Sequence, residues 1–188
     1  MSNWIQTERI RLMPIHAEVL RAVLSGDTKK ADKLLAAKGS DSLVDARRLC
    51  ELRLNQIEAN PELDRRLLQA IVLNENDTLV GHIGFHTEPD AQYLLDQGLR
   101  GVELGYTVFE PYRRRGIATE AVQLMIGWGQ FAFDIDTFVA SIAPDNTPSI
   151  ALVKRLHFKK VGVHIDEEDG PEDIYVLEVS RDSGGAGL

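Results

Sequence analysis

The sequence contains one cysteine, no long apolar run and an excess of negative charge. Because Cys50 has no second thiol to pair with, no internal disulfide can form, which is typical of a reducing compartment. No stretch approaches the ~18 consecutive apolar residues that a membrane-spanning helix needs, and the N-terminal residues lack the apolar core of a signal peptide. We therefore expect a soluble cytoplasmic protein without a membrane partner.

Positive charge is also in short supply. The 21 Lys and Arg residues face 29 Asp and Glu residues, which leaves a formal net charge of −8. A general nucleic-acid binder needs a broad basic surface to neutralise phosphates, so no nucleic-acid partner is expected. The three consecutive arginines Arg113, Arg114 and Arg115 are therefore a local positive spot on an acidic protein.

Metal ligands are scarce. His82 and His86 lie four residues apart on one predicted strand, about 13 Å apart by strand rise, which is too far for two ligands of one ion. With one thiol in the chain, no metal site is predicted. Cys50 lies among leucines on a predicted helix, which favours a packed thiol over a nucleophile.

The length of 188 residues and the 44% hydrophobic content predict one domain over residues 1–182, followed by a flexible tail over 183–188. Strands that first pair in hairpins and later alternate with helices indicate an α/β or α+β sheet with helices packed on it. The expected strands lie near residues 10–15, 69–74, 78–86, 102–109, 137–143, 158–165 and 173–180. The expected helices lie near 16–24, 41–59, 117–132 and 148–156, and residues 88–100 form a polar connection.

The most informative segment, residues 102–122, has the pattern of a strand, a basic turn and an amphipathic helix. Gly116 lets the backbone approach a ligand without a Cβ in the way, and Ala118 keeps the first helical turn clear. Such a turn gathers backbone N–H groups at the positive end of a helix, which suits a phosphate or pyrophosphate. It lacks the Gly-Lys-Ser/Thr ending of a nucleotide-triphosphate loop. Taken alone, an exposed basic helix start is the alternative.

Five segments in order resemble the GNAT superfamily of acyl-CoA-dependent N-acetyltransferases: residues 7–12, 79–84, 103–106, 113–118 and 146–149. More narrowly, they resemble its branch of Rim-type ribosomal-protein N-terminal acetyltransferases and small-molecule enzymes. The resemblance implies an α/β (α+β) fold with a mixed, mostly antiparallel sheet of about seven strands and helices on both faces. Its fourth and fifth strands, here 102–109 and 137–143, would splay apart.

The same resemblance implies acetyl-CoA as co-substrate and a primary amine, on a small molecule or a protein N-terminus, as acceptor. Residues 25–42 and 88–100 would wall the acceptor side of the cleft. The oligomeric state is left open, with a homodimer as one option. In that family the basic turn binds the coenzyme A pyrophosphate and the preceding strand pairs with the pantetheine arm. The resemblance therefore assigns cofactor binding to Thr107, Val108, Phe109, Arg113, Arg114, Arg115, Gly116, Ile117, Ala118 and Asn146.

Asn146 and His157 flank the helix expected over 148–156. Asn146 is either a cofactor contact or a structural turn residue, before a helix that Thr147 is expected to cap. His157 stands where relatives carry the glycine that ends this helix. A left-handed cap there costs a non-glycine residue roughly 1 kcal/mol, so either His157 adopts it or the helix end is reshaped.

Glu103 and Ser149 are the catalytic candidates. Acyl transfer to an amine needs a neutral nucleophile, donors for the oxyanion and a proton for the leaving thiolate. Glu103 matches the general base of many relatives, acting through a water, and its alternative role is to orient the amine or pair with an arginine. A backbone N–H near Val108 would bind the oxyanion. The tyrosine that protonates the thiolate in many relatives is replaced here by Val153. Ser149, water or another tyrosine would supply that proton, or none is needed. The alternative function is an acyl-CoA-binding sensor without catalysis.

Overall fold

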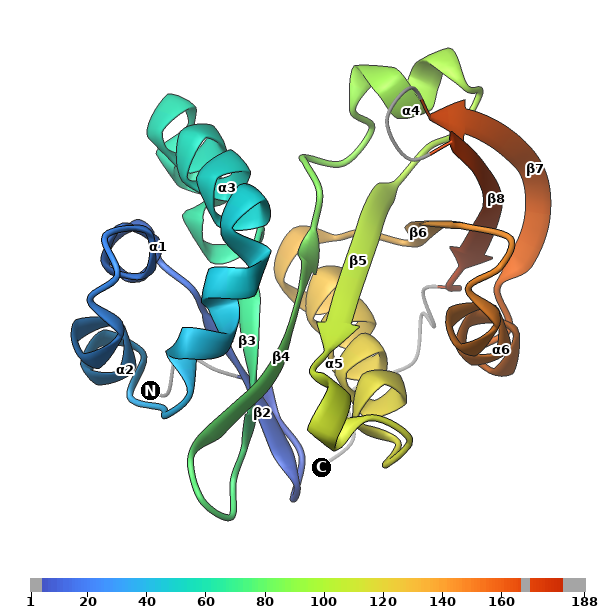
Figure 1. The fold of residues 1–188 in the computed structure, drawn as a ribbon. Helices are drawn as coiled ribbons and strands as arrows, with labels where there is room; N and C mark the ends of the chain where they lie inside the picture. The colour runs from blue at the N-terminus through green and yellow to red at the C-terminus, as the bar shows by residue number, and fades with distance from the viewer. Residues whose placement is uncertain (1–4, 167–169, 181–188) are drawn as a thin grey trace, which may run out of the picture. The chain divides into compact units, whose positions relative to one another are not determined.

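The computed structural model describes residues 5–166 and 170–180 (Figure 1). This part of the chain contains eight β-strands and six α-helices. The chain divides into two compact units, one of Met1–Glu88 with Leu104–Trp128 and one of Pro89–Glu103 with Gly129–Leu188. The predicted tail lies outside the described residues, and a single domain over 1–182 stays a prediction.

The sheet of the first unit is antiparallel throughout. Its strands are β1 (Ile5–Gln6), β2 (Ile10–Pro14), β3 (Gln69–Leu73), β4 (Thr78–Phe85) and the Leu104–Val108 part of β5 (Val102–Val108), paired in that order. All five residues of β3 are buried, as expected for a β-branched and apolar strand covered on both faces. The predicted β3–β4 hairpin is confirmed. The two-residue strand β1 was not expected and raises the strand count above seven.

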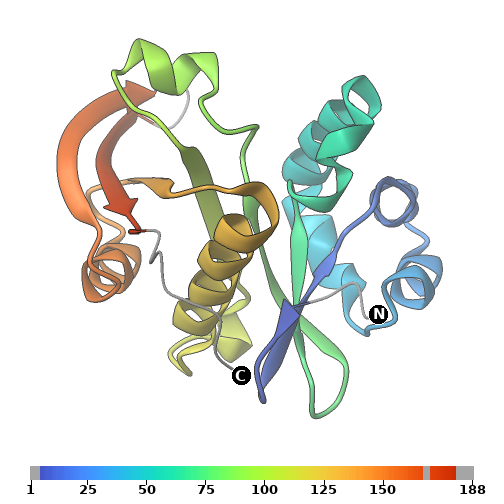
Figure 2. The same ribbon diagram turned by 180° about the vertical axis from the view of Figure 1, so that it is seen from behind.

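Helices lie on both faces of this sheet, as expected. On one face are α1 (Ala17–Leu24), α2 (Thr28–Leu35) and α3 (Arg47–Ala59), and the first part of α5 (Ile117–Phe133) lies on the other (Figures 1 and 2). Leu20, Leu43 and Cys50 from the first face belong to one core cluster with Leu67 and Val72. Cys50 has no exposed surface, which confirms a packed thiol, and its burial raises the pKa of the thiol to about 11.

Two features of this helical face differ from the prediction. The expected helix over 41–59 begins as a 3-10 turn, Ser40–Ala46, and becomes α-helical only at Arg47. Helix α2 was not predicted, because it is a short and mostly polar segment in which only Ala31 and Leu35 are buried. Its start is fixed by Asp27, whose carboxylate accepts a hydrogen bond from the Lys30 N–H at 3.0 Å.

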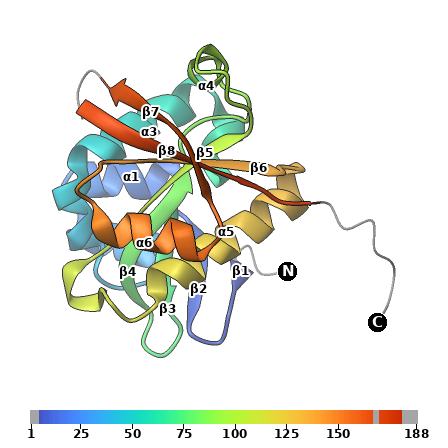
Figure 3. The same ribbon diagram turned by 90° about the vertical axis from the view of Figure 1, so that its right-hand side faces the viewer.

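The second unit is built on β6 (Thr137–Ile142), β8 (Gly170–Glu178) and β7 (Lys159–Asp166), paired antiparallel in that order (Figure 3). Helix α6 (Thr147–Arg155) follows β6 in the chain. Helix α4 (Gln92–Asp96) lies within the predicted polar connection and packs Leu94 against Val139 and Ile174. Five residues are too few for helical periodicity to be visible in the sequence.

The beginning of β5 joins this second sheet by the parallel pairs Val102–Phe138 and Glu103–Val139. From Leu104 onward, β5 pairs antiparallel with β4. The pairing is thus mixed and mostly antiparallel, as predicted. Gly101 makes the approach of β5 to β6 possible, because a Cβ at this position would lie 2.2 Å from the Thr137 carbonyl oxygen and the backbone φ is +98°.

Candidate functional site

The basic turn of the first unit has the backbone geometry of an anion site. After β5 the chain forms a 3-10 turn, Glu110–Tyr112, and α5 begins at Ile117. Arg114 and Gly116 both have positive φ, at 60° and 79°. The Glu120 N–H donates to the Gly116 carbonyl at 3.1 Å, so the N–H groups of residues 117–119 precede the first hydrogen bond of the helix. Such N–H groups form a concave, positively polarised surface that favours anions.

Two of the three arginines also stabilise the turn. Arg113 Nε donates to the carbonyl oxygen of Val108 at 2.9 Å, which ties the turn to the end of β5. The Arg115 guanidinium lies over the Tyr112 ring, 5.6 Å from its centroid, in a cation–π contact. Residues 113–116 are exposed, and a Cβ added to Gly116 would meet only Arg9 Nη1, at 3.8 Å. The turn is therefore open to a ligand of the pyrophosphate class.

The residues predicted to contact the cofactor at the end of β5 differ in the direction of their backbone N–H groups. The Phe109 N–H donates to the Val80 carbonyl at 2.9 Å, and Val108 lies opposite Gly81. Because backbone groups alternate in direction along an antiparallel strand, Thr107 directs its backbone groups toward β4. Phe109 follows the strand and directs its N–H toward β4, while its carbonyl accepts a hydrogen bond from the Tyr112 N–H at 2.9 Å. Val108 directs its N–H toward the other edge of β5, which makes it the strand residue best suited to pair with a ligand.

Glu103, the predicted base, lies in the second unit and is 7% exposed. The hydroxyl of Tyr93 on α4 donates to Glu103 Oε2 at 2.6 Å. A carboxylate that accepts this bond is held in a fixed orientation. Tyr93 was missed in the sequence, because α4 gave no periodic signal by which its side chain could be placed near Glu103.

Asn146, and not Thr147, caps α6. The Asn146 side-chain oxygen accepts a hydrogen bond from the Ser149 N–H at 3.3 Å. The prediction of Thr147 as N-cap is wrong by one residue, because Pro148 is equally suited to the second helical position, where no N–H acceptor is needed. The structural role considered for Asn146 is therefore present. Ser149 is half-buried in the first turn of the helix.

At the other end of α6, His157 adopts the left-handed cap, which was one of the two alternatives considered, with φ of 67°. The Phe158 N–H donates to the Val153 carbonyl at 3.0 Å, and the His157 N–H donates to Lys154 at 3.1 Å. These bonds satisfy carbonyl groups that the end of the helix would otherwise leave without a partner. The helix end is thus not reshaped by the missing glycine.

The first unit also contains a cavity of about 230 Å³ that the sequence did not reveal. Its polar lining consists of Arg53, His82, His86, Tyr106 and Thr107, and leucines of α3 and of the segment before β3 form its apolar wall. Arg53 is 5% exposed and donates through Nη1 to Gln56 Oε1 at 2.8 Å and to the His86 carbonyl at 2.9 Å. Burial, aided by the positive charge of Arg53, lowers the pKa of His82 to about 4, so His82 is neutral at pH 7.

Over residues 5–166 and 170–180, no three His, Cys, Asp or Glu side chains gather in a way that could hold a metal ion. In the same part of the chain, no helix has the length and apolar character needed to cross a membrane.

The fold and the basic turn together define the class of protein to which the chain belongs. Strand β5 leads through an anion-binding turn into a long helix of an α/β protein, which is an arrangement that holds a phosphorylated ligand at a helix N-terminus. The chain belongs to the GNAT acetyltransferase family, since the model of the acetyltransferase (GNAT) domain matches residues 9–159.

Individual relatives agree with this family. A protein named uncharacterized N-acetyltransferase p20, from Bacillus licheniformis, is 33% identical over 115 residues, which cover 60% of this chain and 61% of p20. The GNAT-family acetyltransferase of Bacillus anthracis has a similar structure, with a TM-score of 0.60 and 20% identity over 93% of this chain and 98% of that one. Mycobacterium smegmatis RimJ in complex with CoA-disulfide has a TM-score of 0.59 and 18% identity, over 90% of this chain and 81% of that one. These two structures share the fold, and a Rim-type protein is thus among the structural neighbours.

Proposed function

We propose that the protein transfers the acetyl group of acetyl-CoA to a primary amine of a small molecule or a protein N-terminus by direct attack. The observation that carries this proposal is the basic turn, with its positive φ at Arg114 and Gly116 and its exposed helix start, in a chain of the GNAT family. The backbone N–H groups of Arg114, Arg115, Gly116, Ile117 and Ala118 would bind the pyrophosphate.

The remaining cofactor residues take more specific roles in this proposal. Val108 would pair its backbone N–H with the pantetheine arm or the oxyanion, since that group points away from β4. Thr107 and Phe109 would contact the cofactor through side chains, because the backbone groups of Thr107 face β4 and those of Phe109 bond to Val80 and Tyr112. Arg113 would contribute charge while it holds the turn to Val108. Asn146 would use its side-chain NH₂, since its oxygen caps α6.

Glu103 is the proposed general base. The amine nitrogen attacks the thioester carbonyl carbon, the C–N bond forms, and the C–S bond breaks to release the coenzyme A thiolate. Glu103 accepts the amine proton through a water, and Tyr93 holds its carboxylate in place. Ser149 or a water returns a proton to the thiolate, since Val153 is fully buried and has no proton to give.

The cavity lined by Arg53 and His82 is the proposed acceptor site. Its volume of about 230 Å³ is several times the ~30 Å³ that one water occupies. It is smaller than the roughly 300–1,000 Å³ of pockets that take drug-sized ligands. A small amine or the terminal residue of a peptide fits this volume. Neutral His82 can accept a hydrogen bond there from an N–H group of the amine substrate.

The activity is tested by incubating purified protein with acetyl-CoA and a mixed set of primary amines and measuring released thiol. Transfer predicts thiol release that depends on the amine. An acyl-CoA sensor predicts micromolar binding of coenzyme A without release above background.

The proposed pyrophosphate site is tested by Gly116→Asp, which should nearly abolish coenzyme A binding in calorimetry because it adds bulk and negative charge to the turn. Gly26→Asp is a matched control, because Gly26 also has φ of +79° and a Cβ there meets nothing within 4 Å. The two variants carry the same backbone strain. Equal coenzyme A affinity in both would reject the turn as the pyrophosphate site.

A further inference from the structure

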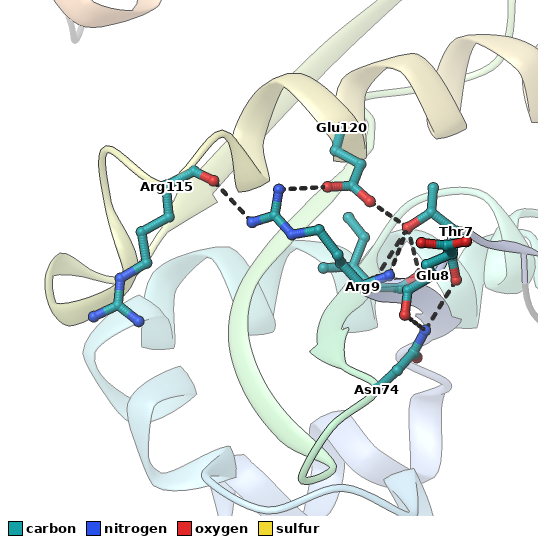
Figure 4. Close-up of polar contacts among 7 residues, drawn as sticks. Thr7, Glu8, Arg9, Asn74, Arg115 and Glu120 are labelled. Carbon is teal, nitrogen blue, oxygen red and sulfur yellow. Dashed lines mark hydrogen bonds and ion pairs between the residues drawn. The ribbon is translucent and has the colours of Figure 1, made fainter.

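Arg9 connects the N-terminal segment to the basic turn. Figure 4 shows its guanidinium between the Arg115 carbonyl and the Glu120 carboxylate. Arg9 Nη2 donates to the carbonyl oxygen of Arg115 at 2.8 Å, and Nη1 lies 3.3 Å from Glu120 Oε2. One arginine therefore contacts both the turn and the first part of α5.

The position of Arg9 is itself fixed by neighbouring contacts. The Thr7 hydroxyl donates to the other Glu120 carboxylate oxygen, Oε1. Asn74 Nδ2, from the β3–β4 turn, donates to the carbonyl oxygens of Thr7 and Glu8 at 3.0 and 3.2 Å. The backbone before Arg9 is thus held to the sheet, and the carboxylate that Arg9 contacts is held by Thr7.

The bond from Arg9 to the Arg115 carbonyl has a consequence for the next N–H group. In a planar trans peptide, the C=O of residue 115 and the N–H of residue 116 point in opposite directions. A guanidinium that holds the carbonyl on one side therefore directs the Gly116 N–H to the other side. Gly116, which follows this peptide, has positive φ, and glycine accepts several backbone conformations, so an external contact is needed to fix the orientation of the peptide.

We propose that Arg9 is a positioning residue for coenzyme A binding: it holds the peptide between Arg115 and Gly116 so that the Gly116 N–H faces the pyrophosphate. This inference rests on the proposed function of the turn. Arg9 also neutralises Glu120, whose carboxylate in the first turn of α5 would otherwise repel an anion bound there.

The test compares Arg9→Met with Arg21→Met by calorimetry with coenzyme A and with pantetheine, which lacks the pyrophosphate. The control is matched, because the side chains of Arg9 and Arg21 are 54% and 53% exposed and each forms an ion pair with a glutamate. Arg9→Met should weaken coenzyme A binding about tenfold, the size expected for losing one hydrogen bond to a charged group. Its pantetheine affinity should equal that of the wild type, and Arg21→Met should leave both affinities unchanged.

Unchanged coenzyme A affinity in Arg9→Met would overturn the inference, and so would equal losses for coenzyme A and pantetheine, which indicate a general structural role. If Arg9→Met does not fold, Thr7→Val tests the same point, since it loosens Glu120 without changing any charge and should weaken coenzyme A binding two- to threefold at unchanged pantetheine affinity. Loss of binding in Gly116→Asp without loss in Arg9→Met rejects only the role of Arg9. Normal binding in both variants rejects the pyrophosphate site itself.

Discussion

Burial beside Arg53 holds the pKa of His82 at about 4, compared with 6.5 for an ordinary histidine. The unfolded chain therefore binds a proton at this residue below pH 6.5, whereas the folded chain excludes that proton until about pH 4. Stability is complete above pH 6.5 and falls as the pH decreases toward 4, by on the order of 3 kcal/mol over the whole window.

This linkage predicts the behaviour of His82→Asn. When the pH is lowered from 7 to 4.5, the free energy of unfolding should fall by about 2 kcal/mol less in the variant than in the wild type. The reason is that asparagine cannot bind the proton that His82 takes up in the unfolded chain. Urea unfolding at the two pH values measures the difference. His157→Asn is the control, because His157 is exposed and asparagine also tolerates positive φ. An identical pH dependence in His82→Asn and the wild type would contradict a neutral buried His82.

Glu103 permits a second test at the residue scale. Glutamine retains a side-chain oxygen that can accept the Tyr93 hydrogen bond, so Glu103→Gln removes the base with little change in shape. We expect turnover to fall by about 10²-fold or more, the lower range for loss of general base catalysis, while coenzyme A affinity stays within twofold. Steady-state kinetics and calorimetry measure the two quantities. Wild-type rates from pH 6 to pH 9 would remove Glu103 from the mechanism.

The helices and strands differ in how well the sequence predicts them. Strands β3 and β4 and helix α5 carry long apolar or β-branched patterns, and their bounds were predicted to within two residues. Helices α2 and α4 were missed because one is mostly polar and the other has five residues. Short helices of this kind depend on caps and on a few buried side chains such as Leu94, and they are too short to carry the long apolar patterns of the other elements.

The end of α6 gives a prediction at the element scale. At φ of 67°, His157 occupies a conformation that glycine adopts without cost and a β-branched residue adopts poorly. His157→Gly should therefore be more stable than His157→Val by about 1 kcal/mol or more in urea unfolding. At Lys154, an exposed helical position, the glycine and valine variants should be nearly equal in stability, or the valine variant should be the more stable one, because glycine is the poorer helix former. Higher stability of valine at position 157 would contradict the cap.

At the scale of the whole molecule, the sequence identified the family and the basic turn but not the cavity. The turn is local, so its glycine, arginines and following helix are adjacent in the chain. The cavity needs α3, the Leu67–Leu68 segment, β4 and β5 to come together, and their meeting depends on the strand register. The contact between Arg9 and Arg115 could not be predicted for the same reason, because the two residues lie 106 positions apart in the chain. A sequence reveals a site whose residues are adjacent in the chain, whereas contacts between residues on different strands are seen only in the folded structure.

The buried thiol of Cys50 has a practical consequence. Disulfide reagents that report free thiols react with the thiolate, and a pKa of about 11 at a side chain with no exposed surface leaves Cys50 almost wholly protonated and shielded at neutral pH. The folded protein should therefore add almost no background to a colorimetric count of released coenzyme A, and micromolar enzyme can be assayed over long times. A cysteine introduced on the surface would likewise be labelled selectively, with the native residue left in place.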